Sequence, residues 1–103
     1  MAQGTIKKLN GENNLSNSIT LNDYTRSNMF EIPSDGYVEV STSHSGNSSA
    51  YAVIFGANTT ESIRIGGYSN NTYSRWATFV RKGMFCYADT VSNNGAVKYY
   101  PLS

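Results

Sequence analysis

Apolar and polar positions alternate over short stretches of this chain, and the alternation is clearest between Trp76 and Asp89. The pattern predicts two strands joined by a tight hairpin at 81–83, because Gly83 can adopt the positive φ that such a turn needs. Alternation assigns one face to Val80, Cys86 and Ala88, continued upstream by Thr78 or Trp76. It assigns the opposite face to Phe79, Phe85 and Tyr87.

The predicted hairpin is unusual because both of its faces carry large side chains. A surface hairpin of a monomeric sandwich is normally apolar on one side and polar on the other. Either a bulge breaks the alternation, or the second face is buried against something other than the protein's own core. A second copy of the chain would fit, which makes Phe79, Phe85 and Tyr87 candidate interface residues.

Short strand signals recur along the rest of the chain, separated by polar and glycine-rich turns. Strands are expected within 19–22, 29–32, 37–40, 50–55, 62–65, 73–80 and 96–100, and loops at 33–36, 41–49, 56–58, 66–72 and 91–95. No helical period is visible, and a parallel sheet would need crossover helices. Seven or eight short strands therefore predict an all-β protein, an antiparallel sandwich or jelly roll.

Residues 1–18 differ from the remainder because they are polar and turn-rich. Leu15 and Ile19 are too isolated among Ser and Asn to form an amphipathic helix. We expect this segment to be an extended arm or a connection to an upstream stalk. A chain of 103 residues accommodates one core, so 19–103 is predicted to be a single β domain.

The composition excludes several classes of protein. With 39% hydrophobic residues the chain is not disordered, and with 15% charged residues its surface must consist mainly of Asn, Ser, Thr, Gly and Tyr. The net charge is +1 without a large basic cluster, so no nucleic acid partner is expected. No apolar run approaches membrane-spanning length, so no membrane insertion is expected. The single cysteine, Cys86, excludes an intrachain disulfide and a cysteine-based zinc site, and we interpret it as a small buried hydrophobe in a protein folded in a reducing cytoplasm.

Three motifs resemble the C-terminal tip domains of bacteriophage tail fibres and tailspikes. Residues 33–40 (P-S-D-G-Y-V-E-V) look like their strand entry, 79–83 (F-V-R-K-G) are similar to their V-P-V-K-K-G-D turn, and 99–102 (Y-Y-P-L) resemble their closing F-Y-P-L. Arg81 stands near where the pattern commonly has proline, and Met84 replaces its acidic residue. The resemblance implies a homotrimeric jelly roll similar to C1q and tumour-necrosis-factor heads, which caps a fibre and often contacts the bacterium. Some phage fibres make this domain as a separate chain that assists assembly.

The residues do not select a catalytic site. Glycan hydrolysis needs two carboxylates roughly 5–10 Å apart, and no pair among the seven acids stands out. His44, the only histidine, is flanked by Ser43 and Ser45, but neighbours on a loop do not make a nucleophile and base. We therefore predict no catalytic residues, no metal site and no cofactor.

Binding is the better candidate, because Tyr, Ser, Asn and Gly also make up antibody paratopes. The stretch 66–76 (G-G-Y-S-N-N-T-Y-S-R-W) concentrates this mixture. Rings could stack on sugars while amide and guanidinium groups bond hydroxyls, so the candidate ligand-binding residues are Tyr68, Asn70, Asn71, Tyr73, Arg75 and Trp76. The alternative for Tyr73 and Trp76 is packing in the core or interface, and for the two asparagines an ordinary turn. The His44 loop and the Tyr99–Tyr100 edge come next as receptor surfaces.

The expected function is that of a non-enzymatic trimeric tip domain of a phage tail fibre or tailspike, located in the virion, attached to an upstream fibre stalk and binding a bacterial surface glycan during host attachment. An alternative is a trimerisation or assembly-chaperone module without a receptor site. A more distant one is part of a polysaccharide-degrading enzyme.

Overall fold

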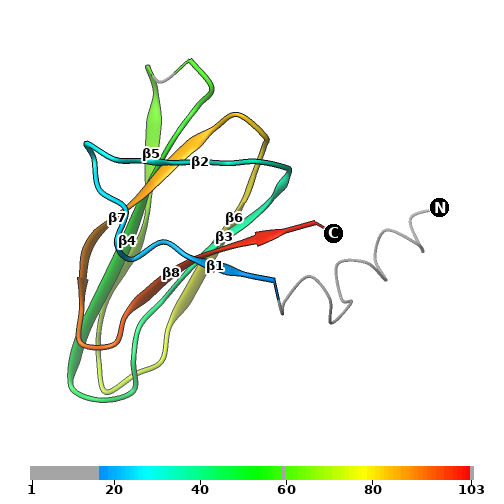
Figure 1. The fold of residues 1–103 in the computed structure, drawn as a ribbon. Helices are drawn as coiled ribbons and strands as arrows, with labels where there is room; N and C mark the ends of the chain where they lie inside the picture. Colours follow the sequence, from blue (N-terminus) through cyan, green and yellow to red (C-terminus); the bar gives the residue numbers. More distant parts are fainter. Residues whose placement is uncertain (1–16, 59, 103) are drawn as a thin grey trace.

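The computed structural model describes residues 17–58 and 60–102, and this part of the chain consists of strands and loops (Figure 1). The strands are β1 (Ile19–Thr20), β2 (Phe30–Glu31), β3 (Gly36–Ser41), β4 (Asn47–Phe55), β5 (Ser62–Asn70), β6 (Arg75–Val80), β7 (Phe85–Ser92) and β8 (Ala96–Pro101). Within these ranges no helix is long and apolar enough to cross a membrane. The arm predicted at 1–18 falls almost wholly outside the described residues.

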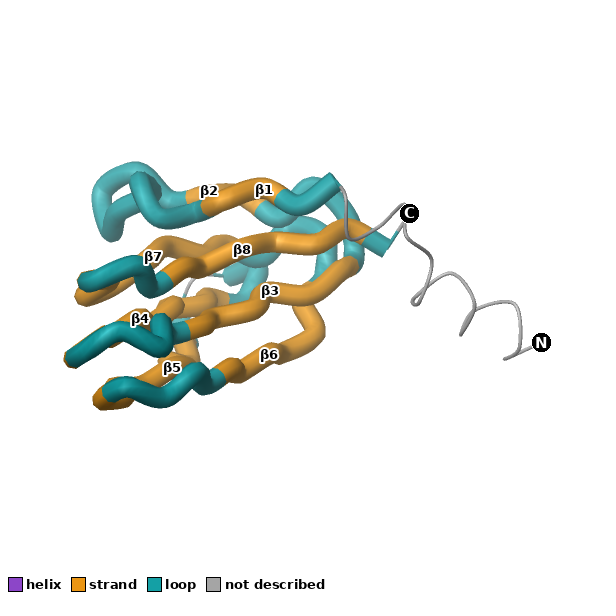
Figure 2. The backbone as a smooth tube through the Cα atoms, turned by 90° about the horizontal axis from the view of Figure 1, so that it is seen from below, coloured by secondary structure: helices purple, strands orange, loops and turns teal. Residues whose placement is uncertain are grey.

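The strands form two antiparallel four-stranded sheets packed face to face (Figure 2). Sheet 1 has the order β1-β8-β3-β6, and sheet 2 has the order β2-β7-β4-β5. The all-β prediction is confirmed, and so is the two-layer antiparallel arrangement. Strands of the two halves of the chain pair in nested fashion, β1 with β8, β2 with β7, β3 with β6 and β4 with β5.

The core lies between the sheets and follows from alternation along the strands, which is strictest in β3. In β3, Val38 and Val40 are fully buried while their neighbours are partly exposed. β4, β7 and β8 contribute in the same way, and the core cluster comprises Leu21, Ile32, Val38, Val40, Ala50, Ala52, Ile54, Val80, Cys86, Val97 and Tyr99. Burying a large aliphatic side chain contributes roughly 1.5–3 kcal/mol, so this cluster stabilises the sandwich. The predicted burial of Cys86 is confirmed.

The segment 81–84 is not a hairpin, and this prediction is wrong. β6 pairs only with β3 in sheet 1, whereas β7 pairs with β2 and β4 in sheet 2. The segment is a corner between the sheets, with Gly83 at φ 91° as the turn requires. Alternating strands and a Lys-Gly turn occur in hairpins and in corners alike. Whether such a segment forms a hairpin or a corner depends on pairing with strands that are distant in the sequence.

Asp35 joins three segments at this corner. Its carboxylate accepts a hydrogen bond from the backbone N–H of Lys82 (2.9 Å), and its carbonyl accepts one from Leu102 (3.0 Å). The adjacent Ser34 carbonyl accepts a bond from the Tyr99 hydroxyl (2.5 Å). The turn entering β3, the corner and the end of β8 are thereby held together. Asp35 is a turn residue, as predicted.

Two predicted loops are shorter than expected. β4 begins at Asn47, inside the predicted loop 41–49, and β5 extends to Asn70, through most of the predicted loop 66–72. Ser48 pairs with Ser69 in this extension, and both are buried. Serine, glycine and asparagine are typical of loops, but backbone pairing in the ladder outweighs that preference here.

A bulge does occur, but in β7 rather than at 81–83. Ser49 and Tyr51 of β4 pair with Ser92 and Asp89, so β7 contains one extra residue. Thr90 in this bulge has a φ of 53°, which is uncommon for a β-branched residue. Its carbonyl accepts a hydrogen bond from the Ser49 hydroxyl (2.9 Å), which holds the irregular backbone in place.

Candidate functional site

Three loops meet at one end of the sandwich, which we call the loop end: β3–β4 (42–46), β5–β6 (71–74) and β7–β8 (93–95) (Figure 1). The Asn93 side-chain amide donates to the carbonyls of Ser45 (2.7 Å) and Asn47 (2.6 Å). These bonds tie two of the loops together.

A hydroxyl cluster supports the loop end from inside. The Thr42 and Ser69 hydroxyls are hydrogen-bonded at 2.8 Å, and the Ser74 backbone N–H donates to Thr42 Oγ1 (3.1 Å). Every buried side-chain nitrogen or oxygen in the described ranges has a hydrogen-bond partner. The loops therefore rest on a fully bonded polar layer, which fixes their geometry.

The two predicted asparagines have different roles. Asn71 has a φ of 58°, its side-chain oxygen accepts a bond from the Gly46 N–H (2.7 Å), and its own N–H bonds the Gly46 carbonyl (2.9 Å). It is a structural residue that links two loops. Asn70, the last residue of β5, is exposed, and its amide makes no hydrogen bond to the described residues.

Tyr73 lies in an exposed stack. Its ring is parallel to that of His44, with centroids 4.9 Å apart and an interplanar angle of 9°. The guanidinium of Arg75 lies 4.6 Å from the Tyr73 ring centroid and donates to the Tyr73 hydroxyl. The structure thus brings His44 together with Tyr73 and Arg75, two residues selected from the sequence.

Arg75 also forms an ion pair with Glu39 of β3, 3.2 Å from Nη1 to Oε2. The hydrogen bond to Tyr73 raises the pKa of the Arg75 guanidinium, burial partly opposes this, and the charge of Glu39 raises the pKa by a smaller amount. The second Glu39 oxygen accepts a bond from the Tyr100 hydroxyl (3.2 Å), and burial followed by the charge of Glu39 raises the pKa of Tyr100. The Glu39 side chain is 21% exposed and is engaged on both oxygens.

Tyr68 lies on the outer face of sheet 2 near the loop end and is 59% exposed. Its hydroxyl donates to the side-chain oxygen of Asn47 (2.6 Å), which orients the ring. Ser49 is its cross-strand neighbour on β4. Tyr68 therefore belongs to the loop end but not to the same face as Arg75.

Trp76 does not join the exposed group. Its ring packs against the core and covers Gly67, where an added Cβ would come within 2.7 Å of the indole. The alternative reading, a structural tryptophan, is the one that the structure supports. The ring closes the edge of the sandwich between β5 and β6, the outer strands of the two sheets.

The predicted interface residues do not share a face. Phe79 is 43% exposed on the outer face of sheet 1, with its ring edge-on to Tyr37 at a centroid distance of 5.9 Å. Phe85 and Tyr87 lie on the outer face of sheet 2, and Tyr87 is already buried at 7% exposure beside Phe55. Alternation placed all three outward correctly, but the corner at 81–84 sends them to opposite sides of the molecule.

An aromatic row missed in the sequence crosses sheet 1. Tyr37 pairs in register with Phe79 on one side and Tyr100 on the other. The three side chains project from neighbouring strands on the face opposite the core. The sequence signal was present, since each alternates with a buried residue, but their adjacency depends on the order of the strands.

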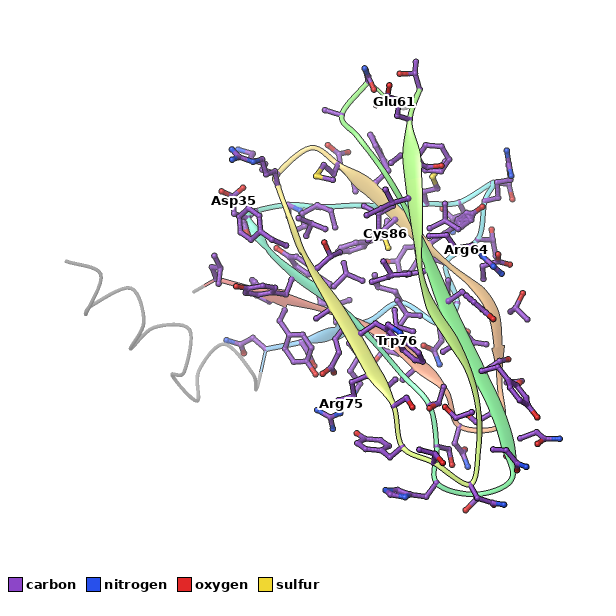
Figure 3. The ribbon with its side chains drawn as sticks, turned by 180° about the vertical axis from the view of Figure 1, so that it is seen from behind. Asp35, Glu61, Arg64, Arg75, Trp76 and Cys86 are labelled. Carbon is purple, nitrogen blue, oxygen red and sulfur yellow. The ribbon has the colours of Figure 1, made fainter. Side chains whose placement is uncertain are left out.

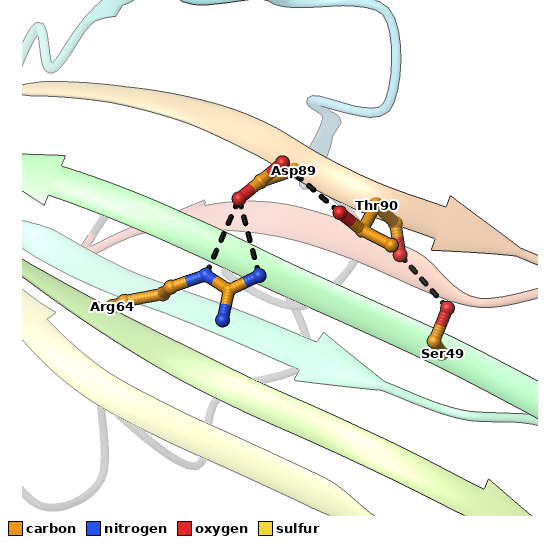
Figure 4. A network of polar contacts seen from close by, with 4 residues as sticks. All are labelled: Ser49, Arg64, Asp89 and Thr90. Atoms are coloured by element: carbon orange, nitrogen blue, oxygen red, sulfur yellow. Dashed lines mark hydrogen bonds and ion pairs between the residues drawn. The ribbon is translucent and has the colours of Figure 1, made fainter.

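Sheet 2 carries a separate polar network on its outer face (Figure 4). Arg64 Nε and Nη2 both lie 3.2 Å from Asp89 Oδ2, and the guanidinium lies 3.7 Å from the Tyr51 ring centroid. Asp89 also accepts a bond from Thr90 (3.1 Å). Asp89 and Glu39 are thus each paired with an arginine on different sheets and do not form a two-carboxylate site.

The described residues contain no group of three or more His, Cys, Asp or Glu that could hold a metal ion. Comparison with known proteins gives no match to a family model, to a curated protein or to a solved structure.

Proposed function

We propose that this chain is the non-enzymatic tip domain of a phage tail fibre or tailspike, that it assembles as a homotrimeric jelly roll on a fibre stalk, and that its loop end binds a bacterial surface glycan during host attachment. Such a domain would fold in the host cytoplasm, function in the virion and need no cofactor.

The strand pairing supports the jelly-roll part of the proposal. A jelly roll can be described as a long antiparallel hairpin folded over itself, in which the first strand pairs with the eighth and the second with the seventh. The pairs β1–β8, β2–β7, β3–β6 and β4–β5 follow this order. The three motifs that resemble fibre tips also meet at Asp35, although they are distant in the sequence. Their joint occurrence has a physical reason, because Asp35 of the first motif is hydrogen-bonded to the other two.

The loop end is the observation that carries the binding proposal. Exposed His44 and Tyr73 stand on loops locked by hydrogen bonds and by a buried hydroxyl layer, and exposed Tyr68 and Asn70 lie at the adjoining end of β5. Rigid loops lower the entropy cost of ordering a site when a ligand binds. Aromatic rings with short polar side chains suit sugars, which offer both C–H faces and hydroxyls.

The test compares wild-type protein with Tyr68→Ala in binding to intact cells of a bacterial panel and to their purified polysaccharides. Tyr68 is mostly exposed, so folding should be unaffected while about 1 kcal/mol of ring contact per site is lost. Three sites on one particle multiply that loss through avidity. Ile63→Ala is the control, since Ile63 is 53% exposed on the same strand but near its other end.

Cell binding that falls with Tyr68→Ala and not with Ile63→Ala supports the proposal. If both variants bind cells as well as the wild-type protein does, the receptor surface lies away from the loop end. Wild-type protein that binds no cell and no polysaccharide contradicts the attachment role.

The second candidate is a trimerisation or assembly module without a receptor site, and the aromatic row on sheet 1 favours it. Phe79 exposes nearly half of its surface beside Tyr37 and Tyr100. Large aromatic side chains grouped on a flat sheet face are typical of interface cores. A trimer that forms but fails every cell and glycan test would select this candidate.

A further inference from the structure

The charges at the loop end are distributed unevenly. Residues 40–60, 65–80 and 90–103 contain no Asp or Glu. Glu39 and Asp89 immediately precede two of these stretches, and each is already paired with an arginine. Exposed Asp23 follows Asn22, whose amide donates to the Gly95 carbonyl of the β7–β8 loop. The three loops themselves contain no carboxylate, and Glu39, the carboxylate beside Arg75, is already paired.

On the edge of sheet 1 that adjoins the loop end, Arg75 and Tyr73 present donors to solvent. Arg75 uses one nitrogen for Glu39 and one for Tyr73, and 55% of its side chain is exposed, so further N–H groups face solvent. Because the Tyr73 oxygen accepts from Arg75, its own O–H is left to donate outward. The exposed His44 ring, stacked on Tyr73, adds an N–H donor beside them.

The neighbouring strand makes the local field positive. Lys98 of β8 is the cross-strand partner of Glu39 and lies on the same outer face. Arg75, Lys98 and Glu39 together carry a net charge of +1. Donors from Arg75 and Tyr73 in a positive field complement an anion.

Building on the proposed function, we infer that the glycan bound at the loop end is acidic, and that its carboxylate or phosphate oxygens are received by Arg75 and Tyr73. Charge-assisted hydrogen bonds to carboxylate or phosphate are stronger than neutral ones and favour the planar guanidinium.

The protein provides a matched control in Arg64. Both arginines lie 3.2 Å from a carboxylate oxygen, both stack on a tyrosine, and their side chains are 50% and 55% exposed. Figure 3 shows them on different sides of the sandwich. Arg64→Gln and Arg75→Gln therefore change the net charge equally at different places.

The experiment uses the polysaccharide purified from cells that the wild-type protein binds. One portion is left untreated, one is carboxyl-reduced and one is dephosphorylated with hydrofluoric acid. We expect roughly tenfold weaker binding after one of the two treatments, which identifies the anion, and a decline with added salt. Arg75→Gln should weaken binding to untreated polymer by about fivefold and Arg64→Gln should not. Glu39→Gln, which removes the nearest negative charge, should strengthen binding.

Opposite effects of Arg75→Gln and Glu39→Gln cannot arise from lost stability, which would weaken binding in both. A bound polysaccharide without acidic groups, or equal binding to all three portions, overturns the inference and leaves the proposed attachment role intact. Equal losses in Arg75→Gln and Arg64→Gln overturn the assignment to the loop end. Absence of binding to any polysaccharide overturns the inference together with the proposed function.

Discussion

Trp76 and Cys86 illustrate how the surroundings of a residue determine its role. Trp76 lies in a stretch of paratope-like composition, yet its ring is drawn inward because Gly67 on β5 leaves the space for it. Large aromatic side chains dominate the packing of small cores, so burial outweighs a role in binding. Cys86 is fully buried between the sheets, and burial raises the pKa of its thiol to about 12.

The raised pKa of Cys86 predicts that stability falls at alkaline pH. In the unfolded chain the thiol ionises near its ordinary pKa of 9, while in the folded protein it keeps its proton to about pH 12. Above pH 9 the unfolded state binds fewer protons, so the free energy of unfolding declines by up to about 1.4 kcal/mol per pH unit. Below pH 8 the thiol should have no such effect.

The measurement is urea unfolding of wild-type protein and Cys86→Ala from pH 7 to pH 10.5. Tyrosine ionisation contributes to both proteins, so the difference between their pH profiles isolates the thiol. The wild-type profile should become steeper than that of the variant above pH 9. Parallel profiles would show that Cys86 is accessible to solvent.

At the scale of elements, the corner at 81–84 determines how the sheets are joined. The Gly83 N–H donates to the Ile32 carbonyl (2.9 Å), the Ile32 N–H donates to the Met84 carbonyl (2.8 Å), and Asp35 accepts from Lys82. The corner is therefore attached to the β2–β3 connection rather than to a partner strand. Because of these long-range bonds, β6 and β7, which are consecutive in the sequence, belong to different sheets.

Asp35→Ala is expected to destabilise the protein by about 1–3 kcal/mol, because the Lys82 N–H loses a charged acceptor. Thermal or denaturant unfolding would measure the loss. Asp23→Ala removes the same charge from an exposed position and should change stability by less than about 0.5 kcal/mol. Equal effects of the two substitutions would show that the corner does not depend on Asp35.

At the scale of the whole molecule, the two outer faces of the sandwich differ. Sheet 1 carries the aromatic row of Tyr37, Phe79 and Tyr100 on three neighbouring strands. On sheet 2, Tyr87 is only 7% exposed, and the 59% exposed Tyr68 stands near the loop end. Arg75 is four residues from Phe79 along β6, roughly 13 Å away. A contact through the aromatic row could therefore leave the loop end free for a ligand.

The protein is expected to be a trimer of about three times the 11.3 kDa chain mass, measured by light scattering after size exclusion. Phe79→Asp should break it, because three symmetry-related charges would be buried without partners. Ile63→Asp is the control, as Ile63 is at least as exposed but lies in sheet 2. A wild-type monomer at micromolar concentration would contradict the trimer, and a trimer that tolerates Phe79→Asp would place its interface elsewhere.

The sequence alone determined the class of fold and part of the core. Period-2 alternation is a local property, so it indicated the strands and put Val80 and Cys86 on one face, which the structure buries. Turn residues such as Asp35 and Gly83 were recognisable because their backbone conformations restrict residue choice. For the candidate site, it selected Tyr68, Asn70, Tyr73 and Arg75, which the structure leaves exposed near the loop end.

The tertiary structure determined the features that depend on the order of the strands in the sheets. Whether 81–84 is a hairpin or a corner, and hence whether Phe79 and Phe85 share a face, follows from pairing with β3, β2 and β4. The role of Asn71 was also decided by tertiary structure, because its side-chain oxygen accepts a hydrogen bond from Gly46, twenty-five residues away. Tertiary structure likewise brings His44, Tyr73 and Arg75 together. Local patterns report which way a side chain points, but neighbours across a sheet are brought together by hydrogen bonds between distant segments.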